Sequence, residues 1–160
     1  MGHLDRRQLL IGGTAGVLGI AAAAMGPTTA FADEGEGIVG TWDLQITDAS
    51  APGGPTTFEG ATTFNPGGGV VNVDSQSPST GLGSWSEGDD GSFKARFMQF
   101  GFNSFNVPDP TTVKLVVTIN GKKSGNAISG SFTYKVYTLN GAVVFPNGMG
   151  TFTGTRFAAT

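Results

Sequence analysis

The sequence predicts an all-β fold, and three observations support this prediction. Apolar and polar residues alternate with a period of two in eight separate runs, which is the pattern of strands with one buried face. Clusters of Gly, Pro, Asn and Asp separate the runs, and such clusters are typical of turns and loops. No window beyond residue 32 shows a clear apolar period of 3.6, and the abundance of Gly, Thr and Phe disfavours helices.

The first 32 residues are typical of an export signal. Arg6-Arg7 precedes an apolar, Gly- and Ala-rich run at residues 9–25, and we expect cleavage after Ala32, directly before Asp33. Arg6-Arg7 followed by Gln8 resembles the twin-arginine motif of bacterial signals, which implies export of a folded protein. A plain secretory signal with two positive charges is the alternative. Either signal predicts a secreted, extracellular protein.

A membrane-spanning anchor is the competing interpretation of residues 9–25. Four glycines weaken the apolar character of these seventeen residues, whereas a spanning helix needs about 20 strongly apolar residues. We therefore expect no stable membrane insertion once the signal is removed.

Cleavage would remove 32 of the 160 residues and leave 128, which suits one domain. We expect a flexible leader at residues 33–37 and a single domain at residues 38–160. The chain has no Cys, and its one His, His3, lies in the signal, so the mature domain lacks Ser-His and Cys-His pairs and the usual zinc ligands. Its 7 Lys and Arg against 11 Asp and Glu disfavour a nucleic-acid partner.

The first three runs are defined by their apolar faces and by the loops between them. Trp42 lies on the apolar face of the first run, and Phe58 and Phe64 lie on that of the second. Pro and Gly in residues 48–55 and 66–69 end these runs, and a short third run follows. The eight predicted strands are residues 38–47, 56–65, 70–75, 81–88, 92–103, 111–119, 126–139 and 142–157.

An aromatic hairpin at residues 81–106 is the strongest local signal, with Asp90-Gly91 as its turn. Its aromatic residues are Trp85, Phe93, Phe97, Phe100, Phe102 and Phe105. Because the fifth strand carries large apolar residues on both faces, we expect one of two solutions. Either a bulge turns Phe100 and Phe102 inward, or a second subunit covers the outer face.

Turn residues define the last three strands. Two prolines at residues 107–110 separate the fifth strand from the sixth, because Pro cannot sit inside a ladder. Asn120-Gly121 is predicted to end the sixth strand, and Asn140-Gly141 to end the seventh. Pro146 interrupts the last run, which predicts a bend or a bulge there.

Eight antiparallel strands with short connections predict an up-and-down barrel, because closure removes the two exposed edges of an open sheet. A two-sheet sandwich is the alternative, since periodicity alone does not distinguish the two. An eight-stranded barrel is just wide enough to be filled by side chains or to hold one small ligand.

Gly40-Thr41-Trp42 at the start of the first strand resembles the Gly-x-Trp signature of calycins, including lipocalins, in which the Trp closes the bottom of the barrel. Gly83-Ser84-Trp85 repeats the pattern. The chain also looks like small exported lipocalin-like proteins of actinobacteria, with the allene-oxide-cyclase-like barrel as a second resemblance. The first resemblance implies a binding cup, and the second implies a cofactor-independent cyclase or isomerase that acts by holding a polyketide- or terpenoid-like substrate in shape.

If the face of Trp42 points inward, register places a largely apolar set of residues inside the barrel. Gln99 and Tyr134 would orient a hydrophobic ligand there, or Tyr134 would simply be hydrogen-bonded within a filled core. The predicted ligand-binding residues are Trp42, Phe58, Phe97, Gln99, Phe132 and Tyr134; Phe64, Phe93, Leu115 and Val117 are expected to face inward with them.

Glu59, Arg96 and Tyr134 are the candidate catalytic residues for the enzyme hypothesis, with Gln99 as a further polarising group. For Glu59, an ion pair with Lys94 or Arg96 is the structural alternative. Asp89-Asp90-Gly91 and Asp109 lack the spacing of a calcium loop and fit turn chemistry, so we expect no metal and no cofactor.

Three functions remain open at this stage. The leading prediction is an exported, soluble binding protein with a small hydrophobic molecule in its barrel. The first alternative is the cyclase or isomerase, and the second is an oligomeric structural or interaction protein that uses the apolar outer face of the fifth strand as a homo-oligomer interface.

Overall fold

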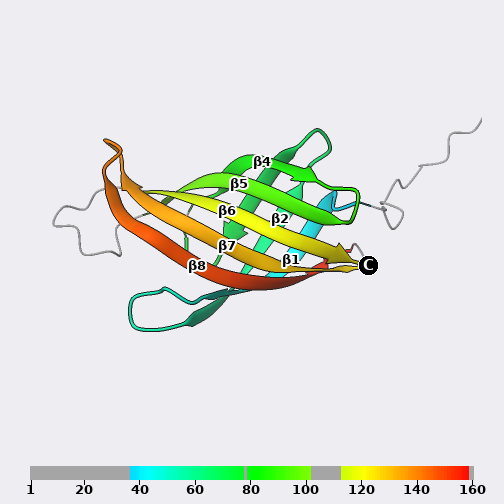
Figure 1. The fold of residues 1–160 in the computed structure, drawn as a ribbon, viewed down its shortest axis with the longest axis horizontal. Helices are drawn as coiled ribbons and strands as arrows, with labels where there is room; N and C mark the ends of the chain where they lie inside the picture. Colours follow the sequence, from blue (N-terminus) through cyan, green and yellow to red (C-terminus); the bar gives the residue numbers. More distant parts are fainter. Residues whose placement is uncertain (1–36, 78, 102–112, 159–160) are drawn as a thin grey trace, which may run out of the picture. The chain divides into compact units, whose positions relative to one another are not determined.

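The computed structural model describes residues 37–77, 79–101 and 113–158, and these residues form an all-β closed barrel (Figure 1). The predicted signal segment with its cleavage site at Ala32-Asp33, nearly all of the leader, Phe102, Phe105 and the prolines at 107–110 lie outside the described residues. The predicted fold class is confirmed, and the sandwich alternative is wrong.

Eight strands follow one another around the barrel, each antiparallel to the next, and the last pairs with the first. No strand of the described barrel is therefore left with an unpaired edge. The strands are β1 (Gly40–Asp48), β2 (Thr56–Phe64), β3 (Gly69–Asp74), β4 (Gly81–Glu87), β5 (Ser92–Gly101), β6 (Val113–Ser124), β7 (Ala127–Thr138) and β8 (Val143–Arg156).

The predicted inward faces are confirmed. In β1, Trp42 and Leu44 are buried while Asp43 and Gln45 are exposed. β5 alternates without interruption, with Phe93, Ala95, Phe97 and Gln99 buried in turn. Such alternation follows from the pleat, since neighbouring side chains on a strand point to opposite faces.

The outer face of β5 is apolar without a bulge. Its pairing with β4 and β6 has no register shift, and Phe100 points outward with 45% of its surface exposed, so the predicted inward turn of Phe100 is wrong. Leu82 and Met98 pair across β4 and β5 on this outer face, and Val71 and Val116 flank them on β3 and β6. We call these four residues the outer apolar strip.

The prediction that Asn120-Gly121 ends the sixth strand is wrong. β6 continues to Ser124, and the turn to β7 is at Gly125, which has a φ of 57°. Gly121 lies opposite Phe93 in the ladder, and a Cβ at Gly121 would collide with the Phe93 ring. The glycine is needed for the space it leaves inside the barrel rather than for a turn.

The predicted irregularity in the last strand is confirmed. The pairing of β7 with β8 shifts register between Tyr134, opposite Gly148, and Val136, opposite Phe145. Pro146 lies between Phe145 and Gly148, at this irregularity, and bulges are among the few places in a sheet where Pro is tolerated. Within the described residues there is no helix of the length and apolarity that crossing a membrane would require.

Candidate ligand-binding cavity

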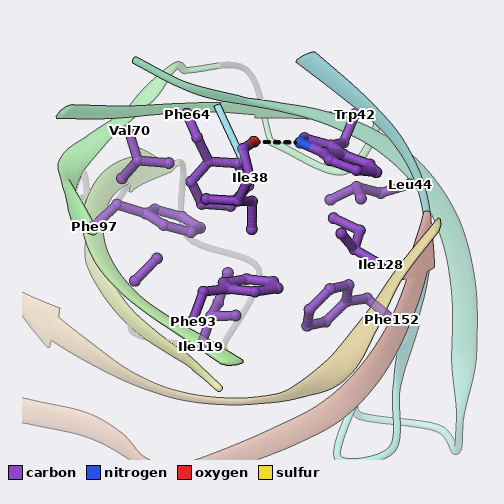
Figure 2. Close-up of a cluster of buried hydrophobic side chains, with 11 residues drawn as sticks. Ile38, Trp42, Leu44, Phe64, Val70, Phe93, Phe97, Ile119, Ile128 and Phe152 are labelled. Carbon is purple, nitrogen blue, oxygen red and sulfur yellow. Dashed lines mark hydrogen bonds between the residues drawn. The ribbon is translucent and has the colours of Figure 1, made fainter. Parts of the chain in front are cut away.

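One end of the barrel is filled by buried apolar side chains, and we call it the sealed end (Figure 2). Trp42 in this cluster has 0% of its surface exposed, and its indole Nε1–H donates a hydrogen bond of 2.8 Å to the carbonyl of Ile38 (Figure 2). Phe64 and Phe93 meet edge to face with centroids 5.4 Å apart, a favourable aromatic geometry. The other labelled members of the cluster are Leu44, Val70, Phe97, Ile119, Ile128 and Phe152.

Arg156, near the end of β8, covers the sealed end. Its guanidinium carbon lies 4.5 Å from the centroid of the Trp42 ring, and its two terminal nitrogens donate to the carbonyls of Val39 at 2.7 Å and Gly37 at 2.9 Å. Gly40 makes room for this contact, because its φ of 129° is unfavourable for other residues and a Cβ there would reach 2.5 Å from Arg156. The cation also interacts favourably with the indole face.

The other end of the barrel contains a cavity of about 370 Å³. This volume is within the range of small-molecule sites. Its wall is mainly apolar and aromatic, and the strand ends around it are Asp48, Asp74, Gly101 and Val113, so we call this the open end. The apolar lining comprises Leu44, Ile46, Ala51, Pro52, Phe58, Phe97, Val113, Leu115, Val117, Ile119, Phe132 and Phe152.

Tyr134 and Asp48 form one polar pair on the cavity wall. The phenol donates a hydrogen bond of 2.7 Å to Oδ2 of Asp48, while Oδ1 accepts from the backbone N–H and the hydroxyl of Ser50, each at 2.8 Å. Burial raises the pKa of Tyr134 to about 12, and the neighbouring Asp48 carboxylate acts in the same direction. The Tyr134 ring also stacks between Phe132 and Phe145. Tyr134 is therefore a fixed, neutral hydrogen-bond donor at physiological pH.

Gln99 and Asp74 form the second polar group. The Gln99 amide donates to the Ser79 carbonyl at 2.8 Å and to Oδ2 of Asp74 at 3.1 Å. Asn72, also on the wall, accepts a hydrogen bond of 2.7 Å from the hydroxyl of Thr62. These buried amides are thus satisfied and held in fixed orientations.

Five of the six predicted ligand-binding residues lie on the cavity wall: Phe58, Phe97, Gln99, Phe132 and Tyr134. Trp42 does not line it: both Trp42 and Phe97 belong to the sealed end, but only Phe97 also reaches the cavity.

Of the candidate catalytic residues, only Tyr134 lines the cavity. Glu59 and Arg96 are exposed on the outer faces of β2 and β5. Glu59 accepts a hydrogen bond of 3.2 Å from Gln45, and β2 does not pair with β5, so the expected ion pair with Lys94 or Arg96 is wrong.

Sequence reasoning missed Asp48, Asn72 and Asp74. Asp48 continues the inward alternation of Trp42 and Leu44 by one further step beyond Ile46, and Asn72 and Asp74 continue that of β3 in the same way. The period of two contained the signal, but Asp48 falls in the predicted loop at residues 48–55, and no inward face was predicted for the strand at residues 70–75.

The described residues contain no group of three His, Cys, Asp or Glu side chains placed to hold a metal ion. Asp90 accepts the backbone N–H of Ser92 at 3.0 Å, and hydrogen bonds from Ser92 lower the pKa of the Asp90 carboxyl. Asp90 therefore caps the β4–β5 turn.

No protein-family model matches the chain, and neither a curated protein nor a solved structure shows significant similarity to it.

Proposed function

We propose that this protein is an exported binding protein that holds a small hydrophobic molecule in its barrel. The observation that carries the proposal is the cavity of about 370 Å³, lined mainly by apolar residues at the open end. The sealed end closes the barrel floor, and Gln99 and Tyr134 supply oriented polar groups. Apolar walls with a few fixed polar groups are the usual composition of such sites.

The polar groups of the cavity suit ligand binding better than acid or base catalysis. A general acid or base works best when its pKa lies near the operating pH, whereas the pKa of Tyr134 is raised to about 12. Glu59 and Arg96 lie outside the cavity. The sealed end, built on Gly40-Thr41-Trp42 and covered by Arg156, supports the further proposal of a calycin-like relationship.

Filling the cavity tests the binding proposal. Val117 lines the cavity and Val116 lies beside it on the outer face of β6, so Val117→Trp and Val116→Trp place the same ring on opposite faces. We expect wild type and Val116→Trp to bind the neutral probe N-phenyl-1-naphthylamine at one site with enhanced fluorescence. Val117→Trp should weaken binding at least about tenfold, because the indole takes the probe's space. Equal binding by both variants, with circular dichroism showing both folded, would refute an internal site.

Export is tested by the intact mass of the protein recovered from the medium of a bacterium that makes the full chain. We expect a mature chain that begins at Asp33, and loss of export when Arg6 and Arg7 are both replaced by Lys. Recovery of the wild-type chain uncleaved in the cell would contradict export, and unchanged export of the doubly substituted chain would contradict the twin-arginine route.

A further inference from the structure

The charged residues that line the cavity are all acidic. Asp48 and Asp74 line it, on the last residues of β1 and β3. Beyond the predicted signal the chain has seven basic residues, all of them among the described residues, and none lines the cavity. They are Lys94, Arg96, Lys114, Lys122, Lys123, Lys135 and Arg156.

The two carboxylates are hydrogen-bonded by neutral groups. Asp48 accepts from Ser50 and Tyr134, and Asp74 accepts from Gln99 and from the backbone N–H of Gln76 at 3.0 Å. These bonds hold each carboxylate at the wall but bring no positive charge to it. A cationic group that enters the cavity would supply the missing opposite charge, and a partly enclosed site screens that attraction less than open water does.

The aromatic lining of the wall also favours a cation. The rings of Phe58, Phe97, Phe132, Phe152 and Tyr134 line the cavity, and aromatic faces attract cations.

From these observations we infer that the preferred ligand is an amphiphilic amine, with its apolar part in the barrel and its ammonium group near Asp48 and Asp74. This inference rests on the proposed binding function and specifies its ligand class. A fatty acid or another amphiphilic anion would meet two carboxylates and no cation in the same position. The cavity therefore selects by charge as well as by apolar fit.

The test compares three ligands with the same chain and different head groups: decylamine, decanol and decanoate. Isothermal titration of the wild-type protein near neutral pH should show decylamine binding at least about tenfold more tightly than decanoate, with decanol between them. Added salt should reduce the difference, because screening weakens the attraction. This series needs no variant and so does not depend on the folding of one.

Substitution of the two cavity carboxylates then tests whether they cause the preference for decylamine. Asp48→Asn with Asp74→Asn should remove most of the preference for decylamine over decanoate. The matched control, Asp43→Asn with Asp89→Asn, changes the net charge equally at exposed positions away from the cavity and should keep the preference.

The possible outcomes test the ligand class separately from the proposed binding function. If decanol and decanoate bind as tightly as decylamine, or decanoate binds best, the charge inference is overturned while the apolar cup stands. If the control pair removes the preference as fully as the cavity pair, the preference comes from net charge and the inference is again overturned. If none of the three ligands binds, the proposed binding function fails as well.

Discussion

Trp42 joins the residues directly before β1 to the sealed end of the barrel through its hydrogen bond to Ile38. Its ring fills the sealed end, its N–H is satisfied by Ile38, and Arg156 packs over its face. A buried indole with a paired N–H combines a large apolar contribution with no unsatisfied donor. The sealed end should therefore depend strongly on this one side chain.

Trp42→Ala should lower the free energy of unfolding by about 3 to 5 kcal/mol, the cost of deleting a large buried aromatic ring. Denaturant unfolding followed by circular dichroism measures it. Thr41→Ala is the control: its hydroxyl lies 2.9 Å from that of Thr63 on the outer face, and its loss should cost at most about 1 kcal/mol. Similar costs at the two positions would contradict the assignment of Trp42 to the floor.

The phenol of Tyr134 should remain un-ionised until the pH approaches about 12. Its pKa in the folded state is raised above the value near 10 of an unfolded chain, so the protonated phenol favours the fold. This contribution is fully present below about pH 10 and is lost as the pH rises through about 12.

Tyrosinate absorbance in Tyr137→Phe isolates the Tyr134 titration, since the chain has two tyrosines. Asp48→Asn should lower the midpoint, because Asp48 contributes to the raised pKa. A midpoint near 10 in the folded protein, or no change with Asp48→Asn, would show that the pair is not formed in solution.

At the scale of the strand, small residues inside the barrel are as important as large ones. Gly121 leaves the space that Phe93 occupies, and Gly148 leaves the space for the Tyr134 ring. Inward glycines opposite large rings let an eight-stranded barrel hold many aromatic side chains without overpacking.

Gly121→Ala should destabilise the protein by about 1 to 3 kcal/mol, the usual cost of overpacking a core. Thermal or denaturant unfolding measures the effect. Gly69→Ala is the matched control within a strand, because its new Cβ would have its nearest neighbour at 3.9 Å, an ordinary contact. If Gly121→Ala is as stable as Gly69→Ala, the Phe93 ring does not pack as described.

Gly121 also shows what could not be predicted from the sequence. Alternation identified the strands and their inward faces, because burial of one face imposes a period of two on the sequence. Alternation could not show that Asn120-Gly121 continues a strand, because this dipeptide is also favoured in turns. The reason for a glycine at position 121 is the Phe93 ring of the neighbouring strand, which needs the space. Nor could alternation exclude a Glu59 to Arg96 ion pair before strand neighbours were known.

At the scale of the whole barrel, the interior has two differently filled ends. Side chains fill the sealed end, and the open end keeps a cavity, so a filled core and an open cavity exist in the same barrel. The outer apolar strip around Leu82 and Met98 is the competing apolar surface of the described barrel. Locating a bound ligand directly would show whether it lies in the cavity or on the outer apolar strip.

That measurement is the anomalous diffraction of bromine in crystals soaked with 1-bromodecane. The account predicts one strong bromine site inside the barrel, among Phe97, Leu115 and Phe132, and its loss in Val117→Trp crystals. Bromine on the outer apolar strip only, or none in a barrel whose open end is packed with side chains, would contradict the central claim that this fold is a cup.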